Sequence, residues 1–223
     1  MPTGEELREV KRKFYEIAGF PNVIGCVDGT HIRIQSPGGE NSELFRNRKG
    51  YFSINVQCIC DADLRIRDVD ARWQGSVHDS TVFGNSLIKI KLEERMNTGY
   101  LLGDSAYPSK SYLLTPVLNP RTPDEQRYNR SHIRTRNTIE RCFGVLKWRF
   151  PCLSHGLRLR LETTVAVIVA VVVLHNIAAS DGNRIEDNAV DLENEEQPDH
   201  DFARKEDLQG VAARTGVINS HFR

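Results

Sequence analysis

The 223-residue sequence has no net charge, no long hydrophobic run and no cysteine framework. Thirty lysines and arginines balance thirty acidic residues, so overall charge indicates no partner. The longest apolar run, Val165–Leu174, is too short for a membrane span, which needs roughly 20 residues. It therefore predicts a buried core element, and we expect no membrane association. The charged N-terminus has no apolar stretch of the kind that secretory signal peptides carry, so none is expected.

Cysteine is scarce and has no metal-binding pattern. There are five cysteines, and Cys58 and Cys60 have no second Cys/His pair at zinc-finger spacing. We expect reduced, mostly buried thiols in an intracellular protein. Glycine-rich phosphate loops and a GxSxG nucleophile elbow are also missing, which argues against those nucleotide-binding and hydrolase classes.

The composition is that of a folded chain, with 39% hydrophobic and 27% charged residues. Its charge is distributed unevenly. Segment 110–160 holds eleven basic and three acidic residues, whereas segment 181–201 holds nine acidic residues and one arginine. The basic segment suits phosphate binding, although a solvated helix surface would look the same. The acidic segment is poor in apolar residues, which predicts disorder.

These features divide the chain into three parts: an N-terminal helix (1–19), one main domain (20–180) and an acidic, disordered tail (181–223). Alternating apolar positions and one β-rich segment predict an antiparallel meander followed by one short strand, and helical spacing predicts the helices 5–18 and 137–150. For 163–178 the Val/Ile content favours a strand and the length favours a buried helix, and we choose the helix. The expected strands are 22–34, 51–60, 64–73 and 101–104, and the expected helices are 5–18, 78–87, 137–150 and 163–178. Strands followed by a strand–helix portion predict a mixed sheet covered by helices, an α/β fold.

Three carboxylates stand in apolar surroundings. Asp28 lies within a predicted strand, Asp104 ends another, and Glu140 lies on a predicted helix. A buried carboxylate is costly unless it has a partner, a proton or a metal ion. Several converging carboxylates favour a divalent cation, and hard oxygen ligands suit Mg²⁺ or Mn²⁺.

Each of these acids also has a simpler interpretation. Asp28 precedes Gly29 and could be a turn or bulge residue. Asp104 and Asp79 could cap helices or turns, and Glu140 could be a solvated helix charge. Spacing by itself leaves these alternatives open.

The segments around these acids resemble one family. They are similar to the PIF/Harbinger-type transposases and their domesticated relatives, the Harbinger transposase-derived nucleases. Six segments carry the resemblance in the family's order: GCVDGTHIRI (25–34), YFSINVQCICD (51–61), GSVHDSTVF (75–83), GDSAYP (103–108), NTIERCFGVLKWRF (137–150) and VVLHNI (172–177).

The resemblance implies a DDE-type catalytic domain with an RNase H-like α/β/α fold. The family's two aspartates then fall on Asp28 and Asp104 and its glutamate on Glu140. Asp79, in the GSVHDS segment, is a further candidate metal ligand. Such a site implies divalent-metal-dependent cleavage of DNA phosphodiester bonds by a two-metal mechanism.

The resemblance also implies DNA as the substrate, and the basic segment supplies candidate contacts. Arg141, Lys147 and Arg149 follow Glu140 on its predicted helix and are the candidate DNA-binding residues. Trp148 is expected in the core, with base stacking as the alternative. Family members often act with a separate Myb-like DNA-binding partner, and an oligomer is compatible with the sequence. The expected location is the nucleus, with the cytoplasm second. The alternative function is a domesticated, catalytically idle DNA- or protein-binding module.

Overall fold

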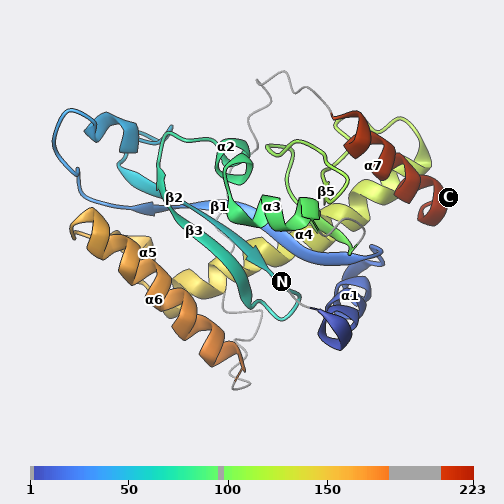
Figure 1. Cartoon of the computed structure of the whole chain (residues 1–223), viewed down its shortest axis with the longest axis horizontal. Coiled ribbons are helices and arrows are strands. Elements are labelled where there is room, and N and C mark those ends of the chain that lie inside the picture. Colours follow the sequence, from blue (N-terminus) through green and yellow to red (C-terminus); the bar gives the residue numbers. More distant parts are fainter. Residues whose placement is uncertain (1–2, 95–97, 181–206) are drawn as a thin grey trace.

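The computed structural model describes residues 3–94, 98–180 and 207–223 (Figure 1). Five strands form one sheet: β1 (Val23–Arg33), β2 (Ser53–Cys60), β3 (Ile66–Gln74), β4 (Tyr100–Leu102) and β5 (Leu113–Leu114). The helices are α1 (Gly4–Ala18), α2 (Asp79–Gly84), α3 (Leu87–Glu94), α4 (Pro123–Arg149), α5 (Cys152–His155), α6 (Leu161–Ser180) and α7 (Leu208–His221), with a 3₁₀ helix, η1 (Ser42–Phe45).

The sheet has the order β3-β2-β1-β4-β5. Strands β1, β2 and β3 pair antiparallel, which confirms the predicted meander. Strands β4 and β5 then add in parallel beside β1. This mixed sheet with its helices is consistent with the expected RNase H-like fold.

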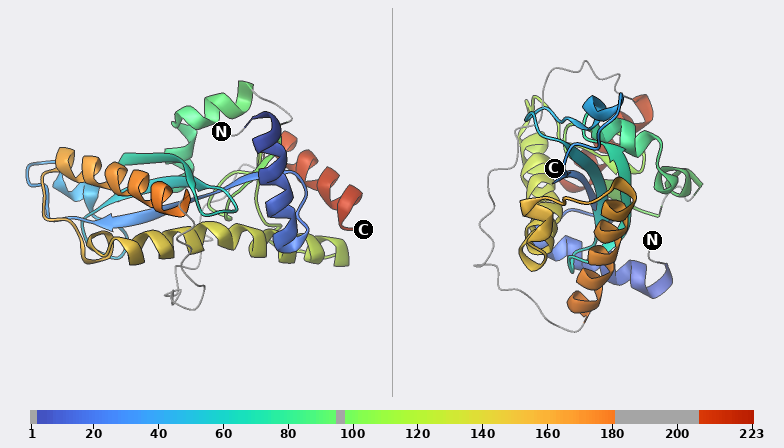
Figure 2. Two further views of the ribbon diagram at one scale, coloured as in Figure 1. Left: turned by 90° about the horizontal axis from the view of Figure 1, so that it is seen from below. Right: turned by 90° about the vertical axis from the view of Figure 1, so that its left-hand side faces the viewer.

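Helices cover both faces of the sheet (Figure 2). Side chains of α1, α4, α6 and α7 pack in one hydrophobic core with one face of the sheet. Side chains of α3, with Phe83 of α2, pack in a second core with Ile24, Val27 and Ile59 on the other face. Strand β2 is buried along its whole length because both of its faces are covered.

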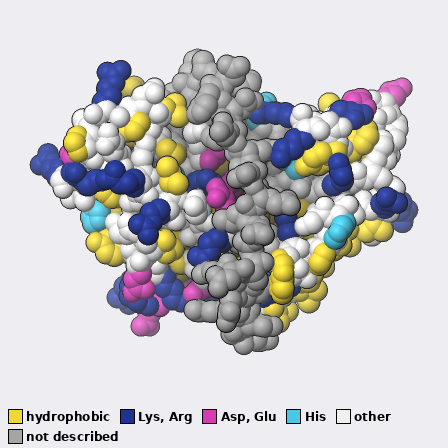
Figure 3. Space-filling model, turned by 180° about the vertical axis from the view of Figure 1, so that it is seen from behind, with side chains coloured by type: hydrophobic (Ala, Val, Ile, Leu, Met, Phe, Trp, Pro, Cys, Tyr) yellow, Lys and Arg dark blue, Asp and Glu magenta, His cyan; other side chains and the backbone are white. Residues whose placement is uncertain are grey.

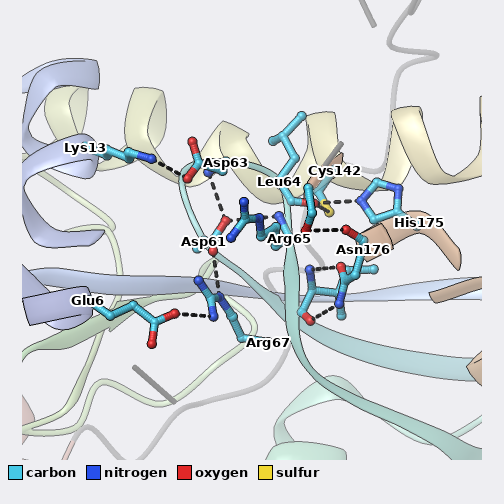
Figure 4. A network of polar contacts seen from close by, with 12 residues as sticks. Glu6, Lys13, Asp61, Asp63, Leu64, Arg65, Arg67, Cys142, His175 and Asn176 are labelled. Carbon is cyan, nitrogen blue, oxygen red and sulfur yellow. Dashed lines mark hydrogen bonds and ion pairs between the residues drawn. The ribbon is translucent and has the colours of Figure 1, made fainter. Parts of the chain in front are cut away.

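A polar network fixes the turn between β2 and β3 (Figure 4). We call it the turn network; it comprises Glu6, Lys13, Asp61, Asp63, Arg67, Cys142, His175 and Asn176, which contact each other or the backbone of Leu64, Arg65 and Ile66. Asp61 accepts hydrogen bonds from the backbone N–H groups of Asp63 and Arg65, at 2.9 and 3.0 Å, and from Nε of Arg67 at 2.6 Å. These bonds close the turn.

Helices α4 and α6 hold the same turn from the other side. The Asn176 amide exchanges two hydrogen bonds, both 2.8 Å, with the backbone of Ile66. The carbonyl oxygen of Leu64, a residue with φ 61°, lies 2.7 Å from His175 Nε2 and accepts the Cys142 thiol at 3.3 Å. His175 and Asn176, the polar residues of the segment VVLHNI, therefore have a structural role.

Two helix predictions need correction. The helix expected over 78–87 is two helices, α2 and α3, and α2 begins at Asp79 without a side-chain cap. Helix α4 begins at Pro123, fourteen residues before the predicted start. The side chain of Thr122 and that of Glu125 form a capping box there. The first half of α4 is polar apart from its buried side, so apolar periodicity did not reveal it.

The prediction of a disordered tail through residue 223 is wrong for residues 207–223, where α7 packs against the domain; residues 181–206 lie outside the described part. Val217, Ile218 and Phe222 join the main core. The carbonyl of Phe222 accepts a hydrogen bond from Arg127, and Lys110 pairs with Asp207 at 2.7 Å. Composition averaged over the tail concealed this helix, because its apolar residues gain burial only against distant segments of the chain such as α4 and β5.

Helix α6 is, by length and composition, long and apolar enough to cross a membrane. In the fold its Ile168, Val171 and Val172 pack in the main core. A core helix passes the same length-and-composition test, so the finding is weak support for a membrane span.

Candidate active site

Strand β1 places Asp28 at the centre of the sheet. Asp28 and Gly29 lie within the strand, opposite Cys58 and Gln57 of β2, so the turn interpretation is wrong. On its other edge, β1 pairs in parallel with β4, with Cys26 beside Leu102. Two residues further along both strands, this register leads to Asp28 and to Asp104. The sheet itself therefore brings the two aspartates together.

Asp104 is held in a local turn just after β4. Its Oδ1 accepts a hydrogen bond from the backbone N–H of Ala106 at 2.8 Å. Asp104 therefore does cap a turn, as its simpler interpretation proposed. It also lies near Asp28, since its carboxylate helps to raise the pKa of Asp28.

Asp79 reaches the same region from the start of α2. A Cβ atom at Gly29 would lie only 2.3 Å from Asp79 Oδ1, so this carboxylate rests directly on the glycine backbone. Asn55 of β2 donates to Asp79 Oδ1 at 2.8 Å and to the Val77 carbonyl at 2.9 Å. Gly29 is required here for the close approach, and Asn55 fixes the orientation of Asp79.

Helix α4 supplies Glu140. Its carboxylate is 27% exposed and pairs with Arg136, one helical turn earlier. The other end of the Arg136 guanidinium binds Asp28 Oδ2 at 2.9 Å. Glu140 is therefore not a solvated helix charge, and Arg136 links it to the sheet.

The electrostatics show that the aspartates crowd one another. Burial, together with the nearby carboxylates of Asp104 and Asp79, raises the pKa of Asp28 well above its usual value, while Arg136 opposes the shift. Burial and the same three carboxylates raise the pKa of Tyr107. The ring of Tyr107 is fully buried, and its hydroxyl lies 3.5 Å from Gln57 Oε1. Three aspartates thus lie close to this tyrosine and the centre of β1, and Glu140 joins them through Arg136.

The donor chemistry fits a divalent cation, but the side chains are not arranged around one. Among residues 3–94, 98–180 and 207–223, no three His, Cys, Asp or Glu side chains form a group able to hold a metal ion. The available donors are hard carboxylate oxygens, which Mg²⁺ and Mn²⁺ prefer. Asn55 Oδ1 is also buried there, and within the described ranges it has no hydrogen-bond partner. The donor atoms are therefore of the type that suits the ion, and Arg136 lies between Asp28 and Glu140.

The two histidines near the acids have other contacts. His31 Nδ1 lies 3.1 Å from the Ser53 hydroxyl, and His78 Nδ1 binds Arg48. Both histidines therefore have hydrogen-bond partners within the fold.

The candidate DNA-binding residues divide into two kinds. Arg141 and Lys147 are half-buried on α4, on the helix that carries Glu140. Arg149 instead points to α6, where it contacts His175 Nδ1 at 3.2 Å and the His175 carbonyl at 3.3 Å. Trp148 is 56% exposed, so its expected place in the core is wrong. Figure 3 shows basic side chains on both sides of one face of the molecule, with acidic side chains near the middle.

Sequence reasoning missed three residues of the site: Arg136, Asn55 and Tyr107. Arg136 lies four residues before Glu140, a spacing that places both on one side of a helix. Asn55 and Gln57 interrupt the apolar strand SINVQCIC at alternating positions, which marks one polar side of the strand. Both signals were available, but the contacts themselves depend on how α4 and β2 lie against β1.

Comparison with known proteins tests the family. The family model described as DDE superfamily endonuclease matches residues 27–176, which include all four acids. This chain belongs to the DDE superfamily endonucleases. The assignment made from the six sequence segments is thereby confirmed.

Relatives of this DDE endonuclease-family chain occur in animals and plants. A bovine protein named "Putative nuclease HARBI1" is 35% identical over 222 residues, covering 97% of this chain, and the human protein of that name is 34% identical with the same coverage. "Protein ALP1-like" of Arabidopsis thaliana is 29% identical over 220 residues and 91% of this chain. The chain spans 63% of the length of the two animal relatives and 52% of the plant relative. No solved structure matches significantly.

Proposed function

We propose that this chain is the catalytic domain of a DNA endonuclease that needs a divalent metal ion, Mg²⁺ or Mn²⁺. The observation that carries the proposal is the convergence of Asp28, Asp79, Asp104 and Glu140 from β1, α2, the end of β4 and α4. Burial and the carboxylates of Asp104 and Asp79 raise the pKa of Asp28, and such crowding of acids is costly for the fold. A site that binds cations offsets this cost.

Asp28, Asp104 and Glu140 would hold the ions, and Asp79 would be a further ligand. Metal ions held by these residues would supply activation of water or of a 3′-hydroxyl and stabilisation of the leaving oxygen. The chain's own residues position these ligands: Asn55 orients Asp79, and the turn at Ala106 orients Asp104. Gly29 leaves the room that Asp79 occupies.

DNA is the proposed substrate. Arg141 and Lys147 are the proposed backbone contacts, since they follow Glu140 on the same helix. Arg149 is the weakest member of the original set because it binds α6. The family resemblance adds two expectations to the proposal: a separate Myb-like DNA-binding partner, and a nuclear location with the cytoplasm second. An oligomer is compatible with the sequence.

A plasmid-nicking assay tests the proposed activity. Supercoiled plasmid is incubated with the protein and Mn²⁺ or Mg²⁺, and nicked circles are quantified on a gel. We expect metal-dependent nicking by the wild type and only background nicking by Glu140→Gln. Glu162→Gln, at an exposed position on α6, is the matched control and should nick as the wild type does.

Two results would contradict the proposal. Nicking that persists in EDTA, or in Glu140→Gln, would show that the carboxylate site is not responsible for cleavage. A wild-type protein that binds plasmid DNA but does not nick it with either ion would favour the idle binding module. The contact between Arg136 and two of the acids is the observation that keeps this second candidate under consideration.

A further inference from the structure

Arg136 is the residue at the site that no catalytic assignment includes. One terminal nitrogen of its guanidinium donates to Asp28 Oδ2 at 2.9 Å, and the other donates to Glu140 Oε1. The side chain is only 14% exposed. The guanidinium therefore lies between a strand acid and a helix acid, within the carboxylate cluster.

The backbone explains this position. Arg136 and Glu140 are separated by four residues on α4, so they project from the same side of the helix, and that side packs against β1. The planar guanidinium carries its donors in a fixed fork, which can bind two carboxylates at once, and it stays charged at all ordinary pH values. A lysine ammonium has no such fork.

The same two carboxylates are proposed metal ligands. A divalent ion bound to both would need their free oxygen atoms and the space between them, which Arg136 now occupies. Two cations at one place also repel each other strongly in a poorly solvated site. Arg136 and the ion therefore cannot both bind Asp28 and Glu140 in this way.

We propose that Arg136 is an internal counter-cation that competes with the divalent metal ion for Asp28 and Glu140. This inference rests on the proposed metal-dependent function and adds a means of regulating it. Without metal, Arg136 neutralises the crowded acids and stabilises the fold. Metal binding displaces the guanidinium, so metal affinity is set partly by an arginine that is not a ligand.

Calorimetric titration of Mn²⁺ into the metal-free protein tests this competition without using activity. We expect Arg136→Gln to bind Mn²⁺ about tenfold more tightly than the wild type, or tighter still. Arg134→Gln, which removes the same charge from an exposed position on α4, should stay within about twofold of the wild type. Thermal melting in EDTA should show a lower melting temperature for Arg136→Gln, with a larger rise on addition of Mn²⁺ than in the wild type.

Arg136→Lys is the second variant, for use if Arg136→Gln does not fold. It keeps the positive charge but lacks the planar set of guanidinium donors. It should bind Mn²⁺ more tightly than the wild type by a smaller factor than the glutamine variant. Equal or weaker Mn²⁺ binding by both variants would overturn the competition while leaving the proposed function in place.

Asp28→Asn distinguishes a failure of the proposed competition from a failure of the proposed metal site. Loss of Mn²⁺ binding in this variant places the ion at the carboxylates. If neither the wild type nor the Arg136 variants bind Mn²⁺, or if Asp28→Asn binds it unchanged, both the competition and the proposed metal site are wrong.

Discussion

The turn network and the carboxylate site use similar residues in opposite ways. In the turn network, Asp61 is almost fully buried, and its oxygens accept two backbone N–H groups and Arg67. Asp28 is also largely buried, but its neighbours include the carboxylates of Asp104 and Asp79. Asp28 also accepts hydrogen bonds, from the Gly29 N–H at 2.8 Å and from Arg136 at 2.9 Å, but two further carboxylates crowd it.

This difference distinguishes polar residues that stabilise the fold from polar residues that a binding site would use. Acids surrounded by donors stabilise a turn and leave nothing for a ligand to complete. Acids crowded together reduce the stability of the folded state, and they persist where binding requires them. Arg136 offsets part of this cost through Asp28 and Glu140.

The largest expected effect distinguishes the two buried aspartates. Asp61→Asn should lower the free energy of unfolding by about 3 kcal/mol, because it leaves Arg67 without its buried partner. Asp28→Asn should change it by less than about 1 kcal/mol at pH 7, because relief of the crowding by two other carboxylates offsets the lost Arg136 pair and Arg136 keeps Glu140 as a partner. Urea unfolding of both variants checks the contrast.

The pH dependence of these variants sharpens the contrast. The folded protein holds a proton on Asp28 more tightly than the unfolded chain does, so the contribution of Asp28 to stability falls as pH rises above its unfolded pKa. Asp28→Asn should remove that decline. A loss of stability in Asp28→Asn as large as that in Asp61→Asn would end the comparison, because both acids would then be structural.

A smaller effect is expected at His132, a buried histidine on α4 one turn before Arg136. Burial lowers its pKa to about 3, and its Nε2 lies 3.0 Å from the Leu114 carbonyl. The unfolded chain takes up this proton near pH 6.5, so the free energy of unfolding should fall by about 2 kcal/mol between pH 7 and 5. His132→Gln should flatten this part of the pH profile, measured by urea unfolding; an unchanged slope would assign the acid sensitivity to other groups.

The smallest effect concerns DNA contact. Lys147→Gln should reduce the slope of log affinity against log salt by about one, the loss of one phosphate contact, measured by fluorescence anisotropy on a DNA duplex. Arg149→Gln should leave the slope unchanged and lower the melting temperature, because it removes contacts to His175. The reverse pattern would move the DNA-contacting role to Arg149.

Sequence patterns predicted much of this architecture because they record local physics. Alternation in 22–34 and 64–73 and the β-rich segment 51–60 predicted the meander, helical spacing predicted α1, and the length of the apolar run predicted α6. Patterns failed where burial came from distant partners. The apolar residues of α7 pack on α4, and the first half of α4 has few apolar residues of its own.

For the candidate site, the sequence by itself determined which acids belong together, since Asp28, Asp79, Asp104 and Glu140 each lie in a family segment. It could not determine how they meet. The parallel register of β1 and β4 brings Asp104 beside Asp28, and a bare glycine face admits Asp79. The place of Arg136 between Asp28 and Glu140 depends on how α4 packs against β1. Residue type and local spacing are carried by the chain, whereas contacts between distant segments exist only once the sheet and helices have packed.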